Sequence, residues 1–260
     1  MNTRPEPQRV MTLIAIALTF GSGAADVTSF TRLGDVFTSV MTGNIVLWGL
    51  ATARGSVTLF SHTAVAIAGY ILGVAAGAWI AYHVKKRPSD RDDLLAYHVI
   101  WVLRAELTLL AGFSAGWEVS GASPAGWAQF CLLATLAAAM GMQSYAVNDM
   151  GMAQVSTTFL TGTLTGLVSS LVSPGQNTPH GPRRFGVLIG LAAGATLGGL
   201  LVATAARAVP ALLLAALVTT LVLAADPAWL APLAREHDRG SLGRSGYAAG
   251  MSLRGVSMSL

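Results

Sequence analysis

The feature that most constrains this chain is a series of apolar blocks, each close to 20 residues long. A helix that rises about 1.5 Å per residue needs about 20 residues to cross about 30 Å of hydrocarbon. Charged residues make up only 11% of the chain, whereas a soluble domain carries about 25%. The pattern therefore predicts an all-α integral membrane protein whose long blocks lie at residues 10–30, 62–84, 94–116, 126–148, 186–206 and 208–225.

Two further apolar blocks, 36–53 and 154–172, are shorter and richer in Thr, Ser, Gly and Asn. They contain an internal repeat, in which Val36, Thr38, Thr42 and Gly43 match Val155, Thr157, Thr161 and Gly162. A helix with glycines at four-residue spacing follows each block, and such spacing lets helix backbones approach closely in lipid. The matching order predicts two membrane repeats, 10–116 and 126–225, although Thr-Gly could also recur by chance in a chain of this composition.

The distribution of basic residues favours one topology. If all eight blocks crossed, the basic loop 85–91 would face the side opposite to Arg4 and Arg9, against the positive-inside tendency. If 36–53 and 154–172 dip in and return, the two halves are inverted, as in many transporters. Twelve of the 16 basic residues are then cytoplasmic: Arg4, Arg9, Lys85, Lys86, Arg87, Arg91, Arg183, Arg184, Arg235, Arg239, Arg244 and Arg254. We therefore predict about six transmembrane helices plus two re-entrant or broken segments, arranged as an inverted repeat.

The ends of the chain lack the apolar pattern. Residues 1–9 are expected to be a cytoplasmic N-terminus, and the Arg-, Gly- and Ser-rich residues 233–260 a disordered cytoplasmic tail. Met11–Phe20, followed by Gly-Ser-Gly-Ala-Ala, also resembles a secretory signal, which is the alternative for the first block. Cys131 is the only cysteine, so no intrachain disulfide can form.

One run of residues carries a family resemblance. Asp26-Val-Thr-Ser-Phe and Phe37-Thr-Ser-Val-Met-Thr-Gly-Asn44 resemble the signature of the YoaK-like family of bacterial inner-membrane proteins. The resemblance covers most of the chain and implies a multi-pass protein of the bacterial inner membrane. It also implies that Asp26, Thr42, Gly43 and Asn44 are important. The family is a membrane domain of unknown function, so the resemblance implies no substrate and no catalytic residue.

Three ionisable residues, Asp26, Arg104 and Glu106, lie in or near the apolar blocks. A charge at the bilayer centre costs about 3 kcal/mol or more, so such a group is normally paired or lines a wet cavity. Asp26 is either a coupling-ion or proton site, or a cap for the polar segment that follows it. Arg104 and Glu106 face different sides of a helix. We expect one of the two to meet Asp26 or the bundle interior, in substrate binding or in a structural ion pair.

The repeated Thr-Gly segments are the preferred solute site: Thr42, Gly43 and Asn44 with Thr161, Gly162 and Thr163. Glycine permits a helix to break, and Thr and Asn supply short polar ligands. Two breaks that enter from opposite sides would meet near the midplane, as in transporters with broken helices. Alternatively, these threonines bond to their own helix and aid packing.

No motif in the sequence indicates catalysis. The histidines have no metal-ligand spacing, and interleaved basic and aromatic residues are absent. We therefore expect no enzyme, no cofactor, no metal site and no nucleic-acid partner. The lipid bilayer and an unknown small polar solute are the expected partners, and homo-oligomerisation is left open.

Two functional classes remain. The first is a secondary transporter or permease of a small polar solute, and the second is a membrane scaffold or binding protein without transport activity. A polar cavity joining Asp26, Asn44 and Thr163 would favour transport, whereas dry packing there would favour a scaffold.

Overall fold

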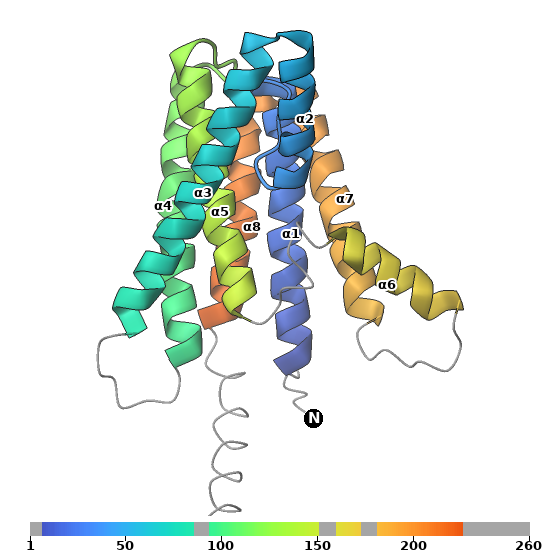
Figure 1. Ribbon diagram of the computed structural model, residues 1–260. Coiled ribbons are helices and arrows are strands. Elements are labelled where there is room, and N and C mark those ends of the chain that lie inside the picture. The colour runs from blue at the N-terminus through green and yellow to red at the C-terminus, as the bar shows by residue number, and fades with distance from the viewer. Residues whose placement is uncertain (1–6, 86–93, 151–159, 173–180, 226–260) are drawn as a thin grey trace, which may run out of the picture.

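The computed structural model describes residues 7–85, 94–150, 160–172 and 181–225. Within these residues the fold is all-α, as predicted, and its helices form one elongated bundle (Figure 1). The helices are α1 (Pro7–Arg32), α2 (Met41–Arg54), α3 (Val57–Lys85), α4 (Leu94–Val119), α5 (Trp127–Asp149), α6 (Leu160–Val172), α7 (Gly181–Thr204) and α8 (Val209–Ala225), with the 3-10 turn η3 (Ala206–Ala208) before α8.

Six of these helices, α1, α3, α4, α5, α7 and α8, are long and apolar enough to cross a membrane. The other two, α2 and α6, have 14 and 13 residues. At about 1.5 Å per residue each is about 20 Å long, which is too short to cross about 30 Å of hydrocarbon. The prediction of six crossing helices with two shorter segments is thereby confirmed for the described residues.

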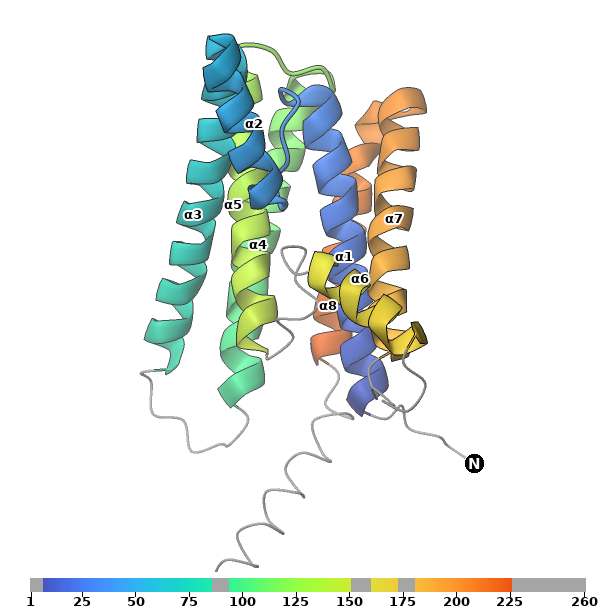
Figure 2. The same cartoon turned by 45° about the vertical axis from the view of Figure 1, so that its right-hand side comes forward.

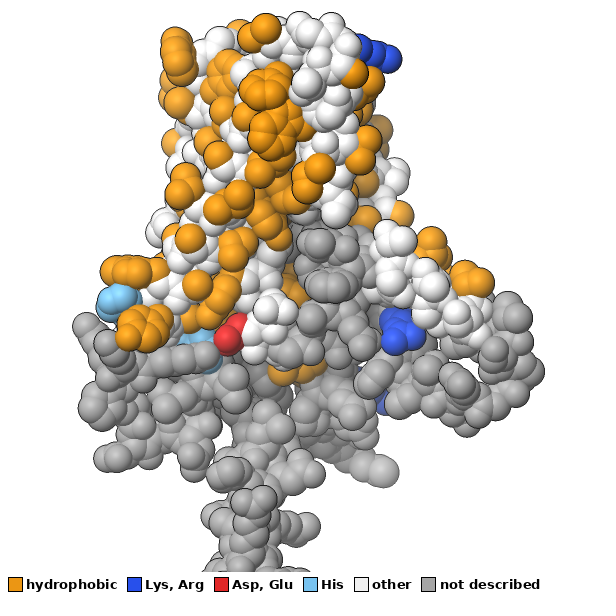
Figure 3. Space-filling view, in the orientation of Figure 1, with side chains coloured by type: hydrophobic (Ala, Val, Ile, Leu, Met, Phe, Trp, Pro, Cys, Tyr) orange, Lys and Arg blue, Asp and Glu red, His pale blue; other side chains and the backbone are white. Residues whose placement is uncertain are grey.

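The outer surface suits a lipid environment. Large apolar side chains such as Ile71, Leu72 and Trp79 are exposed along α3. On the face shown in Figure 3, the charged side chains of the described residues lie toward the two ends of the bundle.

The chain between α1 and α3 enters the bundle and returns to the end from which it came (Figure 2). After Arg32, residues 33–40, here called the re-entrant segment, run back alongside α1. The helix α2 then begins inside the bundle and rises to the end at which α3 starts. Gly55, with φ of 62°, adopts the left-handed conformation that terminates α2.

The second short helix, α6, lies near the opposite end of the bundle, against α7 (Figures 1 and 2). Residues 151–159, through which the chain reaches α6, lie outside the described residues. So do residues 1–6, the basic residues 86–91 and the predicted tail 233–260. The start of α1, the end of α3, the starts of α4 and α7 and the end of α8 all lie at one end of the bundle.

The helix pairs correspond to one another across the two halves of the chain. The most extensive contacts are those of α1 with α7 and of α3 with α5, followed by those of α4 with α5 and of α1 with α8. If α1, α3 and α4 correspond to α5, α7 and α8, each of these contacts has a counterpart. The pattern fits an inverted repeat, which remains a prediction.

Glycine contacts show the same correspondence in detail. A Cβ atom added at Gly194 of α7 would lie 1.9 Å from the carbonyl oxygen of Phe20 in α1. One added at Gly73 of α3 would lie 2.0 Å from the carbonyl oxygen of Ala138 in α5. Both distances are far below van der Waals contact, so only glycine fits at these two helix crossings.

The reverse contacts also match. A Cβ atom at Gly23 of α1 would lie 2.2 Å from the carbonyl oxygen of Leu191, and one at Gly141 of α5 would lie 2.2 Å from that of Tyr70. Each pair is therefore held at backbone contact from both of its helices, which is the close packing that small residues allow in membranes.

Candidate functional site

The carboxylate of Asp26, in the last third of α1, holds the re-entrant segment. Its Oδ1 accepts hydrogen bonds from the N–H groups of Thr38 and Ser39, both at 2.8 Å, and from the Thr38 hydroxyl at 3.2 Å. Its Oδ2 accepts a bond of 2.5 Å from the Ser39 hydroxyl. Asp26 lies six residues before the end of α1, a rise of about 9 Å. These bonds therefore hold the segment well inside the bundle.

Asn44, the fourth residue of α2, holds the same segment from the other side. Its Oδ1 accepts the N–H of Phe37 at 2.9 Å, and its Nδ2 donates to the carbonyl oxygen of Phe37 at 2.6 Å. The Ser29 hydroxyl donates to the carbonyl oxygen of Val36 at 2.8 Å. Asn44 is fully buried, and its amide satisfies both backbone groups of a residue that belongs to no helix.

The inner end of α2 is its N-terminus, a point that the sequence left open. The helix dipole favours negative charge at this end. Val40 precedes the first helical residue, Met41, and makes no side-chain cap. The carboxyl group of Asp26, bound to Ser39 two residues before Met41, lies close to this end, where the helix dipole stabilises its ionised form. The geometry matches the second reading of Asp26, as a cap for the polar segment.

The other predicted solute ligands lie in different surroundings. Thr42 is exposed, and a Cβ atom at Gly43 would lie 3.2 Å from the Phe37 ring. On α6, Thr161 and Gly162 are exposed and Thr163 is buried. Thr42 and Thr161 are each the second residue of a short helix, so the repeat places them in equivalent positions. The short helices themselves lie toward opposite ends of the bundle.

Arg104 and Glu106, on α4, face opposite surroundings. Arg104 is exposed, and its guanidinium carbon lies 5.3 Å from the centre of the Trp101 ring, within cation–π range. Glu106 is fully buried, and neither of its carboxyl oxygens has a hydrogen-bond partner among the residues that the structure describes. Of the two residues, only Glu106 therefore faces the bundle interior, while the side chain of Arg104 lies on the surface.

A small cavity adjoins Glu106, where α1, α4, α5 and α8 meet. Its volume is about 10 Å³, and it is lined by Ala17, Leu18, Gly21, Glu106, Leu110, Met140, Gln143, Leu213, Ala216 and Leu217. Gln143 donates through Nε2 to the carbonyl oxygen of Leu18 at 3.0 Å and to the Ser22 hydroxyl at 2.8 Å. Glu106 and Gln143 thus place two polar side chains in the apolar centre of the bundle.

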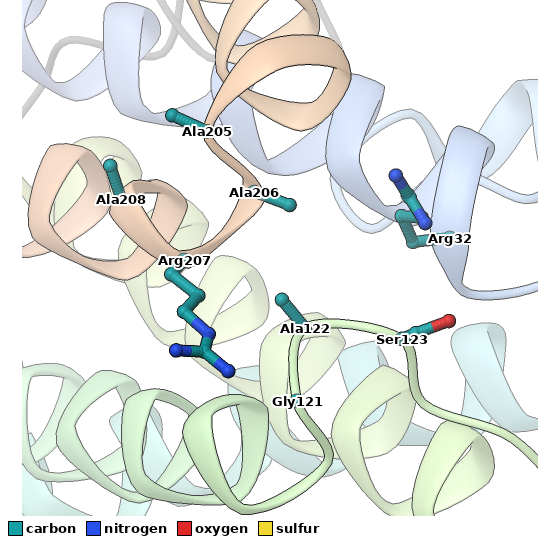
Figure 4. A pocket seen from close by; sticks show the side chains of 8 residues that line it. All are labelled: Arg32, Gly121, Ala122, Ser123, Ala205, Ala206, Arg207 and Ala208. Atoms are coloured by element: carbon teal, nitrogen blue, oxygen red, sulfur yellow. The ribbon is translucent and has the colours of Figure 1, made fainter.

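A larger pocket opens at the end of the bundle to which α2 returns (Figure 4). It has a volume of about 440 Å³ and is lined by Arg32, Gly121, Ala122, Ser123, Ala205, Ala206, Arg207 and Ala208. The Nη2 of Arg32 donates to the carbonyl oxygen of Val202 at 3.0 Å, at the end of α7. Trp117 donates through Nε1 to the carbonyl oxygen of Ala206, a lining residue, at 2.9 Å.

Neither cavity is lined by Asp26, Asn44 or Thr163. Some of the polar residues that the structure brings together were not among the predicted site residues. They are Ser39, Gln143 and the bonded pair of His98 and Asp149. A glutamine within an apolar block was a visible signal for Gln143. The described residues include no group of three or more His, Cys, Asp or Glu side chains that could hold a metal ion.

Comparisons with known proteins identify a family and a relative of this chain. The family model described as "Protein of unknown function (DUF1275)" matches residues 14–225. The UPF0700 transmembrane protein YoaK of Bacillus subtilis (strain 168) is 32% identical over 161 residues, which are 62% of this chain and 66% of that protein. The match thus spans slightly less than two thirds of the relative. No solved structure matches the chain.

Proposed function

This chain belongs to the DUF1275 family of proteins of unknown function, and we propose that this multi-pass membrane protein is a permease or secondary transporter. The solute would be small and polar, and the membrane would be the bacterial inner membrane. Both termini would be cytoplasmic, because this orientation places twelve of the 16 basic residues on the cytoplasmic side.

The re-entrant segment with α2 is the observation that carries this proposal. Non-helical backbone at membrane depth is tolerated only where it is buried in protein or lines a water-filled cavity. Such broken elements are typical of transporters with inverted repeats, in which they lie near the solute path. A second short helix, α6, toward the other end of the bundle supports the same architecture.

The packing suggests which parts would move. The glycine contacts join α1 to α7 and α3 to α5 at backbone distance, so each pair would behave as a rigid body. The re-entrant segment connects the two bodies, because its hydrogen bonds reach Asp26 and Ser29 on α1 while α2 packs on α3. Rocking of the two pairs about this connection would give alternating access, with hinge motion in a short loop.

A scaffold or binding protein without transport is the second candidate, and a specific observation favours it. The side chains of Asp26 and Asn44 are hydrogen-bonded to the re-entrant segment. They therefore have less hydrogen-bonding capacity available for a solute. In a transporter these bonds would hold the re-entrant segment in place, and the solute would contact other side chains.

Metabolite profiling of a deletion strain tests the proposal. Loss of a permease should change the cellular or external level of one class of small polar metabolite, and the wild-type gene should restore it. A variant that folds and reaches the membrane but cannot move, with α1 and α3 joined by a chemical cross-link, should not restore it. Unchanged metabolites in the deletion strain under all growth conditions tried would favour the scaffold.

A further inference from the structure

The carboxyl group of Glu106 is the least compensated polar group at the centre of the bundle. Its side chain is fully buried, and within the described part of the chain neither Oε1 nor Oε2 has a hydrogen-bond partner. Asp26, the other buried carboxyl group, accepts four hydrogen bonds from two residues. The two groups therefore lie in opposite environments, one rich in donors and one without any.

An ionised carboxylate suits Asp26 but not Glu106. Removing an ion from water costs several kcal/mol, and only paired charges or donated hydrogen bonds offset that cost. Charge-assisted bonds of this kind surround Asp26, whereas Glu106 has none from the protein. The simplest way to remove the cost at Glu106 is for the carboxyl group to bind a proton.

Among the residues that the structure describes, no other side chain that lines the cavity beside Glu106 supplies a compensating charge. The cavity beside Glu106 takes residues from α1, α5 and α8, and none of these residues is titratable or charged. The titratable residues of α1 and α5 do not line it: Arg9, Asp26, Arg32, Cys131, Tyr145 and Asp149. Residues Val209–Ala225 of α8 include no titratable side chain, and α3, which also packs on α4, contributes nothing to the lining.

The cavity beside Glu106 has room for a water molecule through which a proton could reach the carboxyl group. Its volume of about 10 Å³ is at the lower limit of the cavity volume that holds one water molecule, about 10–15 Å³. Gln143 lines the same cavity, with its amide fixed by Leu18 and Ser22. A water molecule there would have polar partners in both Glu106 and Gln143.

We propose that Glu106 is a reversible proton-binding site, which exchanges its proton through the cavity that it shares with Gln143. On binding, a hydronium ion in the cavity gives its proton to a carboxylate oxygen of Glu106. One O–H bond of the hydronium ion breaks, the O–H bond of the carboxyl group forms, and a neutral water molecule remains. On release, the carboxylate must gain water or a donor, which requires the helices around the cavity to move apart. The use of this proton to drive solute movement rests on the proposed transport function, whereas proton binding itself does not.

Infrared difference spectroscopy of the purified protein in lipid vesicles tests the proposal with the proton itself as the probe. Spectra at two pH values should show the carbonyl stretch of a protonated carboxyl group, which appears and disappears reversibly. The band should be absent from Glu106→Gln, in which a neutral amide of the same shape replaces the carboxyl group. It should persist in Asp26→Asn, the matched control at the other buried carboxyl group.

A second variant keeps the test decisive if Glu106→Gln fails to fold. Gln143→Leu removes the other polar group of the cavity and should shift both the frequency of the band and the pH at which it changes. Two outcomes would overturn the proposal. In one, the wild-type spectrum contains no band that depends on Glu106 or Gln143. In the other, such a band stays constant over the whole pH range in which the protein remains folded, so that the carboxyl group is a permanent neutral donor. Absence of solute flux with a normal reversible band would contradict the transport function alone.

Discussion

The carboxylate of Asp26 binds Ser39 twice, through the backbone N–H at 2.8 Å and through the hydroxyl at 2.5 Å. This double contact joins α1 to the residues just before α2. Because Ser39 precedes the first helical residue by only two positions, the contact sets where α2 begins inside the bundle. Asp26 therefore helps to set the depth of the re-entrant segment, together with the bonds of Ser29 and Asn44 to the same segment.

The first prediction compares two replacements of Asp26. Asp26→Asn can keep a carbonyl oxygen at the position of Oδ1 and donate through its amide to the Ser39 hydroxyl. We expect it to cost about 1 kcal/mol, since only the charge assistance is lost. Asp26→Leu leaves the N–H groups of Thr38 and Ser39 unsatisfied, at about 1–3 kcal/mol each. Thermal melting in detergent should rank wild type above Asn and Asn well above Leu. Equal melting of the Asn and Leu variants would show that the bonds to Asp26 do not hold the segment.

The second prediction concerns Asn44, whose amide satisfies both backbone groups of Phe37. Asn44→Leu should lower the free energy of unfolding by about 1–3 kcal/mol for each buried group that it leaves unsatisfied. Thr42→Leu, on the same helix with an exposed side chain, is the matched control and should melt near wild type. If Asn44→Leu melts like the control but has lost function, Asn44 binds solute rather than backbone.

The third prediction tests the corresponding helix crossings. Gly194→Ala and Gly73→Ala should each destabilise the protein by about 1–3 kcal/mol, as overpacking does, because a Cβ atom would overlap a carbonyl oxygen of the facing helix. Gly112→Ala, where nothing lies within 4 Å of the added atom, should be neutral or stabilise α4 by about 0.5–1 kcal/mol. Unfolding in a denaturant series measures all three. A tolerated alanine at both Gly194 and Gly73 would mean that the helices are farther apart than described.

Much of the fold could be predicted from the sequence, because the length of an apolar block is set by the thickness of the membrane. The block at 94–116 became α4 (Leu94–Val119), and the block at 126–148 became α5 (Trp127–Asp149). The block at 36–53 was placed less well, since its first residues belong to the re-entrant segment and α2 starts only at Met41. A polar segment that forms no helix has no periodicity from which its path can be predicted.

The site could be predicted only in part. Asp26 and Glu106 stood out as ionisable residues in apolar blocks, but the partners of Asp26 and the surroundings of Glu106 depend on the path of the chain in three dimensions. Asp26 bonds to Ser39, 13 residues away, through a turn that the sequence does not specify. Gln143 reaches Leu18, 125 residues away, and no local pattern indicates such a contact.

The fourth prediction concerns topology. In a Cys131→Ser background, a cysteine at Ser89 should resist a membrane-impermeant thiol reagent in intact cells, and a cysteine at Ser120 should react. The reason is that the basic residues favour a cytoplasmic side for the loop that contains Ser89, and α4 separates this loop from Ser120. Both positions should react after the cells are opened. If only the cysteine at position 89 were labelled in intact cells, the orientation of the protein would be opposite to the predicted one.

Solute flux through the purified protein is the decisive measurement of whether this chain is a transporter. Vesicles that contain the protein would be incubated with a defined mixture of amino acids, sugars, organic acids and nucleosides, and their contents would be measured by mass spectrometry. Protein-free vesicles and vesicles with an unrelated polytopic membrane protein are the controls. We predict that at least one class of solute enters above both controls, with or without an imposed pH gradient. The folded state of the protein in the vesicles would be checked by its thermal melting. If no solute enters above the controls under either condition, the transport function is contradicted and the scaffold function is favoured.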